Sequence, residues 1–194
     1  MTPMTLKSRT LALLLAIGLI PSVAQSQETF QTSNLHEFGG TNAVDGAATL
    51  YRTANSLWLT VSTSDLDKKA AYTVWFVVWN DPLACATNPC SAADLGSGDS
   101  AVIYGAGFVT GTDGTATVTA HLNAGPLAAG RESPLPGVLE VDNGFGAEVH
   151  VIVRSHGRTI PGQVDSQIGS VGGACGTNTC IDQQAAIFLP VAAP

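Results

Sequence analysis

Apolar and polar residues alternate along several short stretches of this chain, at the two-residue period of a β-strand. Ser56–Thr63 is the clearest case, with three aliphatic residues on one face and hydroxyl-bearing residues on the other. Ala147–Ser155 follows the same rule. Ala71–Asn80 differs, because both of its alternating sets are mainly apolar. A strand of that kind must be covered on both faces, so we expect Ala71–Asn80 to be the central strand.

The remaining stretches of this type complete an all-β pattern. We expect further strands over Ala47–Thr53, Ala101–Thr110, Thr115–Leu122, Val138–Val141 and Ile181–Val191. A tight turn at Thr112–Thr115 makes the third of these segments the answering strand of the second. No helical period persists for three turns after residue 24, so no helix is expected. The predicted fold is a single antiparallel β-sandwich, Greek-key or jelly-roll-like, with disulfide-clipped loops.

The first residues have the features of a secretory signal peptide. Lys7 and Arg9 precede an apolar run that ends before Pro21, and Ser22-Val23-Ala24 is a small-x-small cleavage site. We therefore assign residues 1–24 to a signal peptide, 25–46 to an extended lead-in with at most one edge strand, and 47–194 to the sandwich domain. This predicts a secreted or periplasmic protein, with no later run long enough to span a membrane.

The charge of this protein restricts the classes of macromolecule that we expect it to bind. Charged residues make up 12% of the chain, against about 25% in typical soluble domains. Without Lys7 and Arg9, six basic residues stand against 15 acidic ones, which gives a net charge near −9. Nucleic acids and anionic membranes are disfavoured, because no basic patch exists to neutralise phosphates. The expected partner is an unidentified component of the envelope or the extracellular space.

Four cysteines occur in a repeated pattern, Cys-x-Thr-Asn-x-Cys, at Cys85–Cys90 and Cys175–Cys180. An even number of cysteines in an exported chain indicates disulfides. Three pairings are open, and the duplicated spacing favours the two local bridges. A zinc site of four thiolates is the alternative, against which an oxidising compartment argues.

Several short motifs together resemble a known group of proteins. They are Tyr72-Thr-Val-Trp75 with Trp79-Asn-x-Pro82 and Cys85, Glu148-Val-His150 with Arg154-Ser-His156-Gly157, and Cys175…Cys180-x-Asp182-x-Gln184. This combination resembles small exported bacterial β-sandwich proteins of unknown function, and the resemblance implies that fold and no activity. A looser similarity to sandwiches of the copper/zinc superoxide dismutase and chordin-repeat type fails at the metal ligands, since no His-x-His pair occurs.

Histidines and a carboxylate suggest a metal site. His121, His150 and His156 lie on or just beyond two strands that we expect near each other, and Glu148 shares a face with His150. Imidazoles and a carboxylate held on a sheet could bind copper or zinc. The alternative is an ordinary solvated sheet face. The fourth histidine, His36, is expected at the surface of the lead-in.

Trp58 suggests a different ligand. It is the large aromatic residue on an otherwise hydroxyl-rich strand face, and exposed tryptophans beside serine and threonine can stack on sugar rings. The alternative is that another segment covers this face. Trp75 and Trp79, which valines flank, are expected in the core.

No recognisable catalytic constellation is present, and no cofactor is expected. The chain has no Gly-x-Ser-x-Gly motif, and Ser155 and His156 should point to opposite faces of their strand. The sequence thus favours an exported, non-catalytic binding or structural module. A metal protein or enzyme that uses the histidines and a carbohydrate-binding module that uses Trp58 are the two alternatives.

Overall fold

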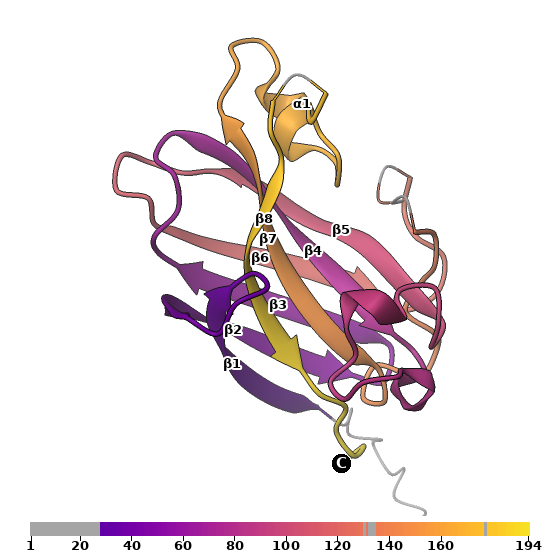
Figure 1. Cartoon of the computed structure of the whole chain (residues 1–194). Helices are drawn as coiled ribbons and strands as arrows, with labels where there is room; N and C mark the ends of the chain where they lie inside the picture. The colour runs from indigo at the N-terminus through magenta and orange to yellow at the C-terminus, as the bar shows by residue number, and fades with distance from the viewer. Residues whose placement is uncertain (1–27, 130, 132–134, 177) are drawn as a thin grey trace, which may run out of the picture.

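The computed structural model describes residues 28–129, 131, 135–176 and 178–194, so the expected signal peptide lies outside the described residues (Figure 1). The strands are β1 (Thr29–Glu37), β2 (Ala43–Thr53), β3 (Ser56–Thr63), β4 (Ala70–Trp79), β5 (Ser100–Val109), β6 (Ala116–Asn123), β7 (Glu148–Arg158) and β8 (Ile181–Phe188). Helical structure is limited to two 3₁₀ turns, Pro82–Ala84 and Ala92–Asp94, and to α1 (Val164–Ile168). In the described part of the chain no helix is long and apolar enough to cross a membrane.

All eight strands belong to one antiparallel sheet, in the order β5-β4-β7-β8-β1-β2-β3-β6. The all-β, antiparallel prediction is therefore confirmed, whereas the expected sandwich of two sheets is replaced by one curled, nearly barrel-shaped sheet. An alternation of period two shows only that one face of each strand is buried. A second sheet can bury that face, and so can a single sheet that curls around its own core.

The two edge strands of the sheet, β5 and β6, approach each other without pairing. In the described residues the ladder partner of β5 is β4 and that of β6 is β3, so the turn at Thr112–Thr115 links two sheet edges and forms no hairpin. A Cβ on Gly105 of β5 would lie 3.1 Å from the Cβ of Ala120 on β6. The absent side chain at Gly105 therefore lets the two edges come together.

The interior of the curled sheet holds one large apolar core. The alternation predicted for β3 is confirmed, because Leu57, Leu59 and Val61 are buried in this core while the residues between them face outward. Tyr72, Val74, Phe76 and Val78 of β4 enter the same core.

Two segments differ from their expected roles. Part of the expected lead-in forms β1, which is an inner strand between β8 and β2 and buries Leu35 completely. Val138–Val141 is not a strand, although Leu139 is buried in the core. In both segments tertiary packing decides the outcome, and a short apolar pattern alone does not reveal it.

A second, smaller apolar cluster lies on the outer face of β4 and β7. It contains Val77, Trp79, Cys90, Ile152 and Ala185, so β4 is covered on both faces as its pattern predicts.

The cover comes from the long connections that carry the cysteines. Both local disulfides, Cys85–Cys90 and Cys175–Cys180, are formed, which confirms the predicted pairing. The first clipped loop, Cys85–Cys90, and the second clipped loop, Cys175–Cys180, lie at opposite ends of the sheet (Figure 1).

Arg52 of β2 is fully buried and ties the ends of three segments together. Its guanidinium donates to the side chain of Gln31 at 2.6 Å and to the carbonyl oxygens of Gly144, Ala147, Phe188 and Leu189 at 2.8–3.4 Å. Burial lowers the pKa of Arg52 to about 10. The side chain remains charged at neutral pH. It donates several hydrogen bonds to backbone carbonyl oxygens that lie outside the sheet ladders.

Arg52→Met should therefore destabilise the fold strongly. The variant keeps the aliphatic stem but leaves several buried carbonyls without a donor, which should lower the free energy of unfolding by about 3 kcal/mol. Urea unfolding followed by circular dichroism measures this. The exposed Arg158→Met is the control, with an expected change within about 0.5 kcal/mol. A loss of similar size in both variants would contradict the assigned role.

Candidate functional site

Glu148 and His150 of β7 lie beneath the first clipped loop. His150 Nε2 lies 2.7 Å from Glu148 Oε1, which also accepts a hydrogen bond from the Cys90 backbone N–H at 2.8 Å. The imidazole ring packs on Trp79, with ring centroids 4.7 Å apart. Burial lowers the pKa of His150, although Glu148 opposes the shift. Both residues thus anchor the loop to the sheet and do not lie on a solvated face.

His156 has the corresponding place beneath the second clipped loop and is fully buried. Its Nδ1 lies 2.7 Å from the Gly173 carbonyl oxygen, so Nδ1 carries the proton. Nε2 then accepts from the Thr73 hydroxyl at 2.8 Å, and Thr73 in turn accepts from Trp75 Nε1 at 2.8 Å. Both ring nitrogens of His156, the Thr73 hydroxyl and Trp75 Nε1 thus all have hydrogen-bond partners. Burial lowers the pKa of His156, which keeps the imidazole neutral.

The four residues of the expected copper or zinc site are not brought together as a set. Glu148 and His150 are in contact, His156 lies beyond them near the far end of β7, and His121 belongs to β6. Because β5 and β4 lie between β6 and β7 across the near-closure, His121 faces a different part of the surface.

Trp58 lies on the open outer face of β3, with 51% of its surface exposed. The described residues form no second layer over this face. His121 on β6 stacks against one side of the indole, with ring centroids 3.7 Å apart and planes 23° apart. About half of the indole therefore remains accessible to a ligand.

Trp58 and His121 belong to a row of four rings that crosses the sheet in register. Phe30 pairs with Tyr51, Tyr51 with Trp58, and Trp58 with His121. The Phe30 and Tyr51 rings are in contact at 4.7 Å, and Phe30 is 71% exposed. We call these four residues the aromatic row. Adjacent strands lie about 4.8 Å apart, so it extends for about 14 Å.

A second row, made of hydroxyl groups, runs beside the first. Thr32, Thr49, Thr60 and Thr119 are paired in register on β1, β2, β3 and β6, two residues along each strand from the aromatic row. We call them the threonine row. Three of the four are exposed and Thr49 is partly so. The outer face of these strands therefore presents an apolar line beside a line of donors and acceptors.

The sequence predicts the outward direction of Trp58 and His121 but misses Phe30 and Tyr51. A signal for them exists. An aromatic or histidine ring stands two residues from a threonine in each strand, as Phe30-Gln-Thr32, Thr49-Leu-Tyr51, Trp58-Leu-Thr60 and Thr119-Ala-His121. The order reverses from strand to strand, as antiparallel pairing requires for two continuous rows. This pattern can be recognised only when the order of the strands in the sheet is known, and the spacing of residues along the sequence does not give that order.

Charged groups lie at both ends of the aromatic row. Burial and the positive charge of Arg131 lower the pKa of His121, so the imidazole is neutral at pH 7. Arg131 donates to the His121 carbonyl oxygen at 2.6 Å and lines a pocket of about 440 Å³ beside it. At the other end, a hydrogen bond with Glu28 raises the pKa of Tyr51.

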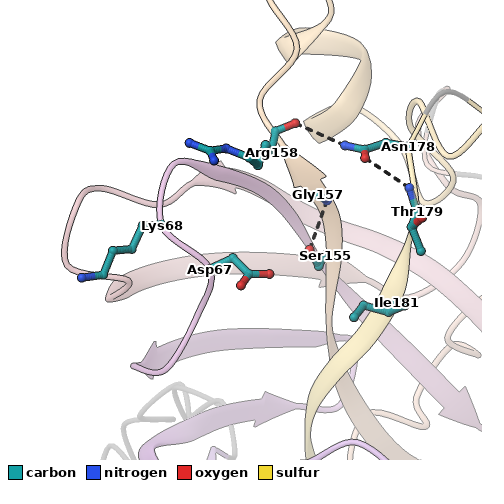
Figure 2. Close-up of a pocket in the computed structure, with 8 residues that line it drawn as sticks. All are labelled: Asp67, Lys68, Ser155, Gly157, Arg158, Asn178, Thr179 and Ile181. Atoms are coloured by element: carbon teal, nitrogen blue, oxygen red, sulfur yellow. Dashed lines mark hydrogen bonds between the residues drawn. The ribbon is translucent and has the colours of Figure 1, made fainter.

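The largest of the described pockets, of about 600 Å³, lies elsewhere, where the end of β7 meets the start of β8 (Figure 2). Its polar groups largely serve each other: Asn178 donates to the Arg158 carbonyl oxygen, and the Gly157 N–H donates to Ser155 Oγ. Lys68 points away from the remaining lining residues. We therefore take the face that carries the two rows as the candidate site.

Comparisons of this chain with models of known families, with curated proteins and with solved structures find no match. The resemblance to small exported sandwich proteins stays a prediction.

The buried His156 and the partly buried His150 predict a loss of stability in mild acid. Their pKa values are lowered by burial, whereas the unfolded chain has histidine pKa values near 6.5. Below that pH the unfolded chain gains protons that the folded chain does not, so stability should be full above about pH 6.5 and fall below it. The expected slope is about 1.4 kcal/mol per pH unit for each histidine. Urea unfolding between pH 8 and 5 measures it, and His156→Gln should flatten the curve. An unchanged slope in the variant would contradict the neutral, buried imidazole.

Proposed function

We propose that this chain is an exported, non-catalytic module that binds polysaccharide through the aromatic row. The observation that carries the proposal is the register of Phe30, Tyr51, Trp58 and His121 on an outer face that no other described segment covers. Export is supported by the signal-peptide features of residues 1–24 and by the two disulfides.

The two rows match the two kinds of surface on a sugar chain. A pyranose ring presents C–H groups on its faces, which pack on aromatic side chains, and hydroxyl groups at its rim. The threonine row offers a donor and acceptors at each position, so it can exchange hydrogen bonds with that rim. A 14 Å row is longer than one ring, so the expected ligand is an extended chain.

Rigidity favours the same interpretation. The aromatic residues stand on paired strands, and Trp58 is held between the strands of Tyr51 and His121. A surface that is already ordered loses little conformational entropy on binding. The stacking of His121 on the indole fixes the orientation of a ring that is half exposed.

Removal of the Trp58 ring should abolish most of the affinity for polysaccharide. Stacking of a nucleic-acid base on an aromatic side chain is worth about 1–3 kcal/mol, and with the same value for a sugar ring Trp58→Ala should weaken binding roughly 5- to 150-fold. Depletion of the purified protein from solution by insoluble β-linked glucan and by chitin measures this. Phe30→Ala should weaken binding in the same direction by a smaller factor, since Phe30 lies at the end of the row.

Leu83→Ala is the matched control. Leu83 is 94% exposed and lies in the 3₁₀ turn Pro82–Ala84, just before Cys85 and away from both rows, so its truncation should leave binding unchanged. Wild-type protein that stays in solution with every polysaccharide, or binding that survives both Trp58→Ala and Phe30→Ala, would overturn the proposal.

A further inference from the structure

The imidazole of His156 lies against the second disulfide. Its Nδ1 is 3.6 Å from Cys175 Sγ and 3.4 Å from Cys180 Sγ. Among the described residues these three side chains form a group whose ligand atoms all lie within 4.8 Å of one another. Asn178, from within the loop, donates to the His156 carbonyl oxygen and holds the loop on the strand. The structure thus places two sulfur atoms and one buried imidazole nitrogen around one point.

We propose that reduction of the Cys175–Cys180 disulfide creates a binding site for one thiophilic metal ion, of the zinc(II) or copper(I) type, with His156 as the third ligand. In the oxidised protein the sulfur atoms share a bond and carry no thiolate charge, so the site is closed. In the oxidised protein the second clipped loop only covers the sheet, and in the reduced protein it binds the metal ion.

The redox step needs a dithiol as reductant. The dithiol passes two electrons to the S–S bond and becomes a disulfide, and each released sulfur takes up one of the two protons that the dithiol loses. Metal binding then releases both protons, because the thiolate is the ligand form. The sum is one disulfide exchanged for another and two protons set free for each metal ion bound.

His156 must change its tautomer to join the site. Nδ1 now carries a proton toward the Gly173 carbonyl oxygen, and a ligating nitrogen carries none. The proton can be held on Nε2 instead, where Thr73 Oγ1 lies at 2.8 Å and can accept it. A second group that receives the far N–H of a ligating histidine is a regular feature of metal sites.

The ligand set determines the class of metal. Two thiolates and an imidazole favour zinc(II) and copper(I) over hard cations such as magnesium or calcium. Four residues separate Cys175 from Cys180, which is within the ligand spacing of structural zinc sites. Their Cα atoms are 5.3 Å apart, so both side chains already point toward one place.

The first clipped loop supplies an internal control. It has the same Cys-x-Thr-Asn-x-Cys spacing, but the nearby His150 directs Nε2 to Glu148 at 2.7 Å. Cys90 Sγ lies 3.7 Å from the Pro82 carbonyl oxygen. Among the described residues no third histidine, cysteine or carboxylate ligand atom groups with Cys85 and Cys90, so reduction of this disulfide gives a dithiol without a third ligand.

The test is a titration of phosphine-reduced protein with cobalt(II), followed by competition with zinc(II), in the absence of oxygen. Cys85→Ser/Cys90→Ser, which retains the proposed site, should bind one cobalt ion with a thiolate charge-transfer band. Cys175→Ser/Cys180→Ser should bind at least about 10- to 100-fold more weakly, and so should His156→Gln. The oxidised protein should not show the band.

Equal affinity in the two double variants, or a folded His156→Gln that binds as tightly as its parent, would overturn the proposal. Because His156 is fully buried, the variant could fail to fold, and nitrogen-15 spectra of the reduced wild-type protein provide a second measurement. A zinc-dependent shift of His156 Nδ1 supports coordination. An unchanged Nδ1 resonance at full zinc occupancy refutes it.

Discussion

The structure depends on the fact that β4 is apolar on both faces. A sheet that curls around one core can bury only its inner side, so the outward residues Val77, Trp79 and Ile152 need a separate cover. The first clipped loop packs on these residues through Cys85 and Cys90, and the second covers His156 and Thr73 further along the same face. Each rests on a histidine of β7, and each disulfide limits the freedom of a connection that would otherwise be long and without regular structure.

This constraint divides the outer surface into two parts. Over β4 and β7 the clipped loops occupy the face, and the conspicuous histidines there serve packing and hydrogen bonding. Over β1, β2, β3 and β6 no loop is needed, because their outward residues are mostly hydroxyl-bearing and tolerate water. The aromatic row stands out on this open half, since four rings in a hydroxyl-rich face gain nothing from solvent and are available to a ligand.

The sequence predicts local features well and long-range features poorly. Alternation places the inward residues of β3, and the repeated cysteine spacing predicts both disulfides. The alternation cannot distinguish two sheets from one curled sheet, since both arrangements bury the same face of each strand. The shared face of Glu148 and His150 on β7 is predicted, but not the cover over it or over His156, which comes from loops distant in sequence. Phe30 and Tyr51 become site residues only through the register that aligns them with Trp58.

The measurement that tests the central claim most directly is a titration with a soluble β-linked oligosaccharide, followed through the three tryptophan indole N–H resonances. Trp58 is exposed, whereas the N–H groups of Trp75 and Trp79 are bonded to Thr73 and to the Asp94 carbonyl within the covered half. The account predicts that the Trp58 resonance shifts with saturation and the other two stay in place. A shift of Trp75 or Trp79 with Trp58 unmoved, or no shift in any of the three, would contradict it.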